Sequence, residues 1–136
     1  HGAKMVHAVS CATVPKLTVV LRKGYGAGYY AMCGKGYEPD HIVAWPTAEI
    51  SVMGPEGMVS IFARKLLAAQ EDPAPLAKFL ADKIRETIDP VIAAGWGYID
   101  DIIDPRQTRK VLATLLELTR NKTVQRPYRK HGVVPV

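Results

Sequence analysis

Cysteine is scarce in this sequence of 136 residues, which has only Cys11 and Cys33. Two cysteines are too few for a disulfide framework, and their separation does not match the paired spacing of a structural zinc site. We therefore interpret both as small buried hydrophobic residues of a protein in a reducing compartment.

Long hydrophobic runs are also missing. No apolar stretch approaches the about 20 residues that span a bilayer, and no signal-peptide pattern opens the chain. Apolar residues make up 48% and charged residues 23%, which is typical of one globular domain. Because the chain begins at His1 instead of methionine, we expect it to be a processed or excised piece of a longer protein.

Motifs for catalysis by side chains are absent. There is no HExxH, and the histidines lack the spacing of metal ligands. Neither a Gly-x-Ser-x-Gly nucleophile motif nor a GxxxxGK[ST] phosphate loop is present. The carboxylates Asp100, Asp101 and Asp104 are interpreted as structural, because adjacent residues of an extended segment point to opposite faces and Asp104 suits a helix N-cap.

Positive charge is in excess, with a formal net charge of +5. Much of it lies in the last 31 residues. Proteins that bind single-stranded nucleic acid combine basic residues with aromatic side chains that stack on the bases, and Tyr128 is the only aromatic residue near this cluster. We therefore expect a solvated face, or a surface that meets an anionic cofactor or a partner subunit. The cluster consists of Arg106, Arg109, Lys110, Arg120, Lys122, Arg126, Arg129 and Lys130.

Short apolar segments and amphipathic segments alternate along the chain, which predicts an α/β class with a thin sheet, as in part of a larger domain. Expected strands are 17–21, 42–45 and 50–53, with an edge segment at 98–103. Expected helices are 3–12, 29–33, one from Pro55, one over 76–88, a turn at 91–94 and one from Asp104.

Several apolar side chains are expected to be buried. Helical spacing groups them into three stripes: Met58, Ile61, Phe62 and Leu66; Leu76, Leu80, Ile84 and Ile88; and Val111, Leu112, Leu115 with Leu118 or Thr119. Tyr29, Met32, Trp45 and Phe62 are interpreted as core residues.

Glycines 24, 26 and 28 recur where a strand turns into a helix. As a dinucleotide fingerprint this GxGxG pattern is weak, and the acidic residue expected about twenty positions later is missing. Two interpretations stay open. The turn either needs only positive φ, or it presents unpaired helix N-terminal amides that stabilise a developing oxyanion.

Three stretches resemble one family: HGAKMVHAVSCATVPKLTVVLRKGYGAGYYAMCGK, AWPTAEISVMGPEGMV and DPRQTRKVLATLLELTRNK with RPYRKHGVVPV. They are similar to the carboxyltransferase (β) subunits of biotin-dependent acyl-CoA carboxylases, such as those acting on propionyl-CoA or methylcrotonoyl-CoA. The resemblance implies a crotonase-like fold, a spiral of β-β-α turns. Residues 1–136 would be the C-terminal part of the second, biotin-side domain, with a helical C-terminal layer. The acyl-CoA-binding half is absent, so we expect this chain to be inactive by itself.

The resemblance also implies a reaction and its site. A carboxyl group would move from N1 of carboxybiotin to the α-carbon of an acyl-CoA, with biotin itself acting as base. The backbone amides of Ala27 and Gly28 would hold the ureido oxygen of biotin, Gly26 would permit the close turn, and Tyr25 would pack beneath it.

Two further residues are implied as biotin- or substrate-binding. Tyr30 falls at the position that helps to set acyl-chain size in the family. Arg64 would line the same pocket, unless it is a solvated helix charge. The acyl-CoA substrate stays open among acetyl, propionyl, methylcrotonoyl and others.

The implied cofactor is biotin, carried on a separate domain or subunit, with no metal in this part. The implied partners are acyl-CoA, a biotin carboxyl carrier protein, a biotin carboxylase subunit and further copies of the chain in a dimer-built oligomer such as a hexamer. Neither nucleic acid nor membrane insertion is implied. The location would be the cytoplasm, or the mitochondrial matrix in a eukaryote.

Two alternatives remain. The chain could belong to a biotin-dependent acyl-CoA decarboxylase, which runs the transfer in the opposite direction at the same site. It could also be a non-catalytic assembly module of the same fold.

Overall fold

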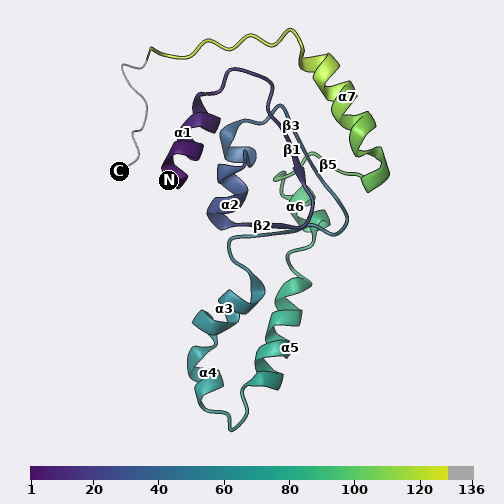
Figure 1. The fold of residues 1–136 in the computed structure, drawn as a ribbon. Coiled ribbons are helices and arrows are strands. Elements are labelled where there is room, and N and C mark those ends of the chain that lie inside the picture. The colour runs from purple at the N-terminus through teal and green to yellow at the C-terminus, as the bar shows by residue number, and fades with distance from the viewer. Residues whose placement is uncertain (129–136) are drawn as a thin grey trace.

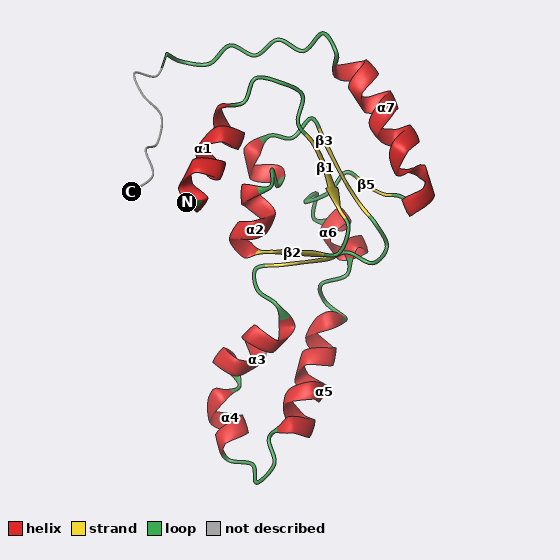
Figure 2. Cartoon of the chain, viewed as in Figure 1, coloured by secondary structure: helices red, strands yellow, loops and turns green. Residues whose placement is uncertain are grey.

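The structure, a computed structural model, describes residues 1–128 (Figures 1 and 2). In this part of the chain no helix is both long and apolar enough to cross a bilayer. The elements in chain order are α1 (Gly2–Cys11), β1 (Leu17–Val20), β2 (Lys23–Tyr25), α2 (Gly26–Ala31), the 3₁₀ turn η1 (Lys35–Tyr37), β3 (His41–Ala44), β4 (Glu49–Ser51), α3 (Pro55–Phe62), α4 (Arg64–Ala68), α5 (Ala74–Arg85), α6 (Pro90–Gly95), β5 (Asp101–Ile102), the 3₁₀ turn η2 (Pro105–Gln107) and α7 (Thr108–Thr119).

Two consecutive β-β-α turns form the centre of the fold. The first is β1-β2-α2 and the second is β3-β4-α3. The leading strands pair in parallel, Leu17 opposite His41, and β5 extends this sheet from the other edge of β3. The second strands, β2 and β4, pair in parallel as a separate small sheet that runs crosswise to the first (Figure 1). The expected α/β class and β-β-α spiral are thereby confirmed.

The core lies where α2 and α6 cover the larger sheet. Strand β3 is buried almost completely, as its run of apolar residues predicts for a central parallel strand. Small side chains on the sheet and on α6 let these elements approach closely. The cluster comprises Val20, Tyr29, Ile42, Ala44, Ala48, Ala93 and Ile99.

Strand β2 continues into α2 without a loop. Gly26 has φ +50°, and a Cβ on it would lie 2.7 Å from the carbonyl oxygen of Val52. The helix therefore begins at Gly26, three residues before the predicted start, because the glycine makes the turn in a single residue. It also ends earlier than predicted, at Ala31, and Cys33 takes the left-handed conformation (φ 72°).

Helices α3, α4 and α5 form an arm that extends from the sheets (Figure 1). Pro55 begins α3 as predicted, but the predicted stripe is wrong, since Val59 is the residue that α3 buries, along with Pro55. The helix ends at Phe62, which is 82% exposed, and a new helix starts at Arg64. Because one continuous helix is replaced by two short ones, Ile61 and Leu66 also stay exposed.

Some of the other residues predicted to be in the core are buried, and others are exposed. Tyr29 is buried and Trp45 half-buried, whereas Met32 is 65% exposed because it follows the end of α2. On α7 the expected apolar residues are only partly covered, and Leu118 is exposed while Thr119 faces inward. Cys33 is buried as predicted, but Cys11 is exposed, because it ends α1 at the surface.

The acidic residues singled out in the sequence have structural partners. Asp104 accepts a hydrogen bond from the N–H of Arg106 at 2.8 Å and caps the turn before α7, as predicted. Asp100 accepts from the N–H of Ile42 at 2.9 Å and pairs with Lys35. The structural interpretation of both carboxylates is therefore confirmed.

The segment after α7 is attached to the loop before β3. Lys122 forms an ion pair with Asp40 at 2.7 Å, and Arg126 lies 3.8 Å from Glu38. Arg106 and Arg120 also pair with carboxylates of this chain. Part of the basic cluster thus stabilises the fold, while Arg129 and Lys130 lie outside the described residues.

Replacing Gly26 by alanine should lower the free energy of unfolding by about 2 kcal/mol or more. The left-handed backbone alone costs a side chain about 1–2 kcal/mol, and the new Cβ would displace the Val52 carbonyl. Urea denaturation of the full chain measures the effect. Gly28→Ala is the matched control, since Gly28 is helical with open space around it, and it should be neutral or stabilising by up to about 1 kcal/mol. Equal losses would contradict the assigned turn.

Replacing Asp40 by asparagine should cost about 1.5–3 kcal/mol at pH 7, the usual range for hydrogen bonds to a charged group. Burial raises the pKa of Asp40, but the hydrogen bonds from Lys122 and from the N–H of Lys16 outweigh burial and hold this pKa below its ordinary value. The stabilisation is therefore complete above about pH 4 and is lost as the pH falls through the lower folded-state pKa.

Urea denaturation of the wild type and the Asp40→Asn variant between pH 7 and pH 2.5 tests this prediction. The difference between the two should shrink only below about pH 4. Glu38→Gln is the control and should change stability by less than about 0.5 kcal/mol, because the Glu38 side chain is 81% exposed. A difference that disappears already near pH 6 would contradict the assigned ion pair.

Candidate functional site

The first turn of α2 presents two backbone amides. The N–H groups of Ala27 and Gly28 have no intrahelical acceptor, and among residues 1–128 no backbone or side-chain acceptor takes them. Both residues are exposed, and no heavy atom would lie within 4 Å of a Cβ on Gly28. A ligand oxygen can therefore approach these donors directly.

Tyr25, the residue before this turn, connects it to β4 and to the start of α3. Its ring lies against Gly54, where an added Cβ would be 3.1 Å from Cε2 of the ring. Its hydroxyl donates a hydrogen bond to Glu49 on the neighbouring strand. Burial, followed by the hydrogen bond to the Glu49 carboxyl and the charge of that carboxyl, raises the pKa of Tyr25 to about 12. The hydroxyl thus stays protonated, and the Tyr25 ring packs against Gly54, in the segment that leads from β4 into α3.

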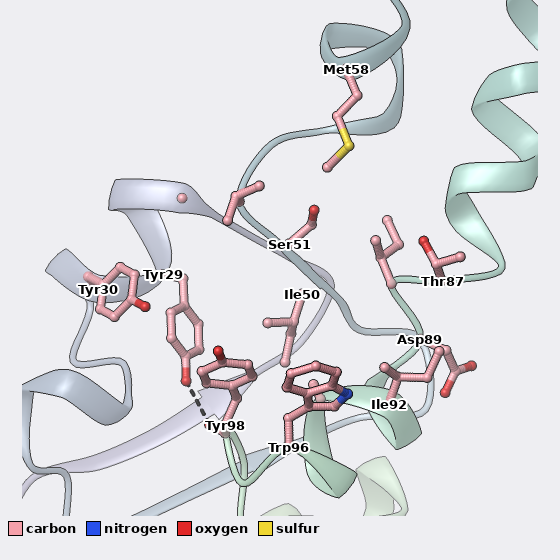
Figure 3. Close-up of a pocket in the computed structure, with 14 residues that line it drawn as sticks. Tyr29, Tyr30, Ile50, Ser51, Met58, Thr87, Asp89, Ile92, Trp96 and Tyr98 are labelled. Carbon is pink, nitrogen blue, oxygen red and sulfur yellow. Dashed lines mark hydrogen bonds between the residues drawn. The ribbon is translucent and has the colours of Figure 1, made fainter. Parts of the chain in front are cut away.

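A cavity of about 380 Å³ opens beside α2 (Figure 3). The β4 strand and the residue after it form one wall, α6 and the loop behind it form another, and Met58 of α3 reaches in from the arm. The lining is Gly26, Tyr29, Tyr30, Ile50, Ser51, Val52, Met58, Thr87, Ile88, Asp89, Ile92, Ala93, Trp96 and Tyr98. Its volume and mostly apolar surface are typical of small-molecule sites.

Tyr30 is held at the cavity by neighbouring aromatic rings. Its ring centroid lies 5.2 Å from that of Tyr29 and 6.5 Å from that of Tyr37, both in edge-to-face geometry. Such pairs add about 0.5–1.5 kcal/mol beyond burial. The side chain is still 43% exposed, so it offers a fixed surface to a ligand.

The structure brings most of the predicted site residues together. Gly26 and Tyr30 line the cavity, while Ala27 and Gly28 lie between them in the chain on the exposed side of the same turn. Arg64 is different: it begins α4 on the arm, is exposed, and does not line the cavity. Its alternative interpretation as a solvated helix charge fits this position.

Two residues of the site were missed in the sequence. Trp96 and Tyr98 follow α6, and their rings lie next to each other below Ile50 (Figure 3). The signal was present, because a tryptophan between Gly95 and Gly97 puts a large apolar ring in a loop. Periodicity cannot detect such a residue, since it belongs to no helix or strand.

Several polar side chains around the cavity are engaged within the chain, whereas among residues 1–128 the hydroxyls of Tyr30 and Tyr98 and the indole N–H of Trp96 make no hydrogen bond. Asp89 caps α6 by accepting from the N–H of Val91 at 2.7 Å, and Thr87 donates to the carbonyl of Ile84. The Tyr29 hydroxyl donates to the carbonyl of Tyr98 at 2.6 Å. The arrangement therefore suits electrostatic stabilisation by amides next to an apolar pocket, rather than acid–base catalysis by a side chain.

Comparison with known proteins agrees with this geometry. Residues 1–134 match the family described as carboxyl transferase domain. The 12S subunit of methylmalonyl-CoA carboxyltransferase from Propionibacterium freudenreichii subsp. shermanii is 48% identical over 99% of the chain. The α subunit of methylmalonyl-CoA decarboxylase from Propionigenium modestum is 43% identical over the whole chain. The chain spans 26% of the length of each.

Solved structures confirm the crotonase-like fold. The transcarboxylase 12S structure, a hexamer assembly with methylmalonyl-coenzyme A bound, matches with a TM-score of 0.86 and 45% identity over the whole chain and 26% of its own. The β subunit of geranyl-CoA carboxylase from P. aeruginosa matches with a TM-score of 0.79 and 32% identity over 98% of the chain and 26% of its own. On sequence and structure alike, the chain belongs to the carboxyl transferase domain family.

Proposed function

We propose that this chain is the biotin-side part of an acyl-CoA carboxyltransferase, in which the amides of Ala27 and Gly28 form an oxyanion hole. The observation that carries the proposal is the pair of exposed N–H groups without acceptors at the edge of an apolar cavity. Donors of this kind lower the reaction barrier by about 2.7–4 kcal/mol each when negative charge develops on the oxygen that they bind.

The residues present fit a biotin ureido group. Its carbonyl oxygen would accept from the N–H groups of Ala27 and Gly28, at the positive end of α2. Biotin, when bound, carries the carboxyl group that is exchanged with the acyl-CoA. Gly26 lets the turn form, and Tyr25 keeps the amides in place through Gly54 and Glu49. Tyr30 would contact the substrate at the other side of the turn.

The reaction needs partners beyond this chain. Its accessible surface of 9621 Å² exceeds the roughly 7,000 Å² of a compact monomer of this size. The excess supports burial against further chain or further copies, as in the hexamer assembly of the transcarboxylase 12S structure. We propose acyl-CoA, a biotin carboxyl carrier protein and a biotin carboxylase subunit as partners, in the cytoplasm or, in a eukaryote, the mitochondrial matrix, since a relative from Rattus norvegicus is named mitochondrial.

A decarboxylase is the second candidate, because the Propionigenium modestum relative is named as one. Carboxylation and decarboxylation use the same site in opposite directions, so the same residues serve both. A non-catalytic assembly module is less well supported, since it would not need accessible amides beside a cavity.

A hybrid tests the proposal. It is the 12S subunit in which these 136 residues replace the matching quarter of the chain. We expect it to exchange carboxyl between malonyl-type thioesters and free biotin, measured with labelled carboxyl. Gly28→Pro removes one donor within the first helical turn, where proline is tolerated, and should lower kcat about 10²–10³-fold. Helical circular dichroism should change little.

Gly28→Ala is the matched control, because it keeps the N–H and fits the open space around the residue. It should retain most of the activity. We expect no turnover by the chain alone, because the acyl-CoA-binding half is not part of it. Full activity of the Gly28→Pro hybrid would overturn the assigned amide hole.

A further inference from the structure

A network of four residues surrounds the hydroxyl of Tyr29. This hydroxyl donates to the carbonyl of Tyr98 at 2.6 Å (Figure 3) and accepts from the N–H of Lys35 at 3.2 Å. The side chain of Lys35 in turn forms an ion pair with Asp100, two residues after Tyr98. The ion pair therefore joins the two segments that hold the hydroxyl.

Asp100 attaches this network to the larger sheet. Its carboxyl accepts from the N–H of Ile42 at 2.9 Å, and its own N–H donates to the carbonyl of Ile42 at 2.8 Å. The Nδ1 atom of His41 lies 3.7 Å from the same carboxyl. Burial raises the pKa of Asp100, but the hydrogen bonds from Lys35 and Ile42 and the charge of Lys35 outweigh burial and hold this pKa below its ordinary value. The carboxyl is therefore charged at neutral pH.

The orientation of α2 depends on Tyr29. The helix has only six residues, whereas an isolated helix shorter than about 12–15 residues is marginal in water. A Cβ on Gly34 would overlap the Tyr29 ring, so the segment that carries Lys35 lies directly against this ring. Gly28 immediately precedes Tyr29 in the chain. Any displacement of Tyr29 therefore also displaces the amides of Ala27 and Gly28.

We infer that Asp100 is a positioning residue for the proposed oxyanion hole, and that it acts through its ion pair with Lys35 and through Tyr29. The inference rests on the proposed function, to which it adds two residues outside the cavity lining. The ion pair holds both partners of the Tyr29 hydroxyl in place, and Tyr29 holds the first turn of α2. Loss of the charge on Asp100 leaves the amides present but changes their direction.

The amide signals of α2 test this coupling without an assay of activity. The full chain is labelled with ¹⁵N and compared by NMR with its Asp100→Asn and Lys35→Met variants. Asparagine keeps an oxygen for the N–H of Ile42 but removes the charge that attracts Lys35. We expect both variants to shift the N–H signals of Ala27 and Gly28. Lys35→Arg keeps the charge and should give signals close to those of the wild type.

Asp101→Asn is the matched control. Asp101 is the next residue in the chain, its side chain is exposed, and its carboxyl accepts from the N–H of Ile102 at 2.8 Å. The substitution therefore removes the same charge without touching the Tyr29 network, and the signals of Ala27 and Gly28 should not move. Circular dichroism checks that each variant is folded.

Kinetics of the hybrid 12S subunit test the consequence for catalysis. Asp100→Asn and Lys35→Met should each lower kcat about 10- to 100-fold, because a displacement of about 1 Å can cost about 10²-fold. The KM for the thioester should change little, since the acyl-CoA-binding half lies outside this chain. The double variant should lose no more than either single variant, because all three break the same ion pair. Lys35→Arg should retain most of the activity, and Asp101→Asn should retain all of it.

Three results would overturn the inference: signals of Ala27 and Gly28 that Asp100→Asn does not shift, equal kcat values for Asp100→Asn and Asp101→Asn, or losses that add up in the double variant. Failure of the proposed function gives a different pattern. Shifted amide signals together with a wild-type hybrid that does not exchange carboxyl would contradict the proposed function, although Asp100 would still be coupled to the turn. Unshifted signals with an active hybrid would contradict the positioning role alone.

Discussion

The close contact between Gly26 and the carbonyl of Val52 determines how the two β-β-α turns fit together. Gly26 directly follows β2 as the first residue of α2, and Val52 follows β4, which pairs with β2. With no Cβ at Gly26, the two backbones approach to a distance that any other residue would prevent. Helix α2 therefore starts next to the segment that leads into α3. That position creates both the amide turn and one wall of the cavity.

Tyr29 connects this turn to the opposite wall. It lies in α2, packs in the core, and donates its hydroxyl to the carbonyl of Tyr98, while the N–H of Lys35 donates to the same hydroxyl. A buried hydroxyl without a partner would cost about 1–3 kcal/mol, so the bond is maintained. The loop that carries Trp96 and Tyr98 is thereby fixed relative to Ala27 and Gly28. This hydrogen bond joins two parts of the site that are 69 residues apart in sequence.

Much of the fold could be predicted from local signals. Proline at the start of α3, Asp104 as a cap and the apolar run of β3 each act within a few residues, and each was identified correctly. The apolar stripe of α3 was not, because periodicity shows that a face is apolar but not which element covers it. The α7 stripe is partly covered, with Thr119 instead of Leu118 as its last member. Phe62 and Leu118 remain exposed in this chain, where nothing packs over them.

The candidate site also contains features that local sequence signals predict and features that depend on long-range contacts. The glycine turn was recognisable because positive φ and close approach are properties of one residue and its neighbours. Its link to Val52 and Gly54 depends on strand pairing between β2 and β4, which no short motif encodes. Arg64 was placed near the pocket on the assumption of one continuous helix after Pro55, and the break at Ala63 moves it onto the arm. Trp96 could not be predicted as a cavity residue, because that prediction requires the position of the loop that follows α6.

The proposed catalysis by main-chain donors has a consequence for how the site can change. Amide N–H groups do not titrate and are unaffected by most side-chain substitutions, so the chemistry is preserved while the cavity walls vary. Tyr25, with its pKa raised to about 12, likewise keeps its supporting hydrogen bond over the working pH range. The relatives that share this fold are named for methylmalonyl-, propionyl- and geranyl-CoA. Under the proposed function, one amide turn combined with different side chains at a cavity position such as Tyr30 would be a physical route to that range, because packing would then select the size of the acyl group.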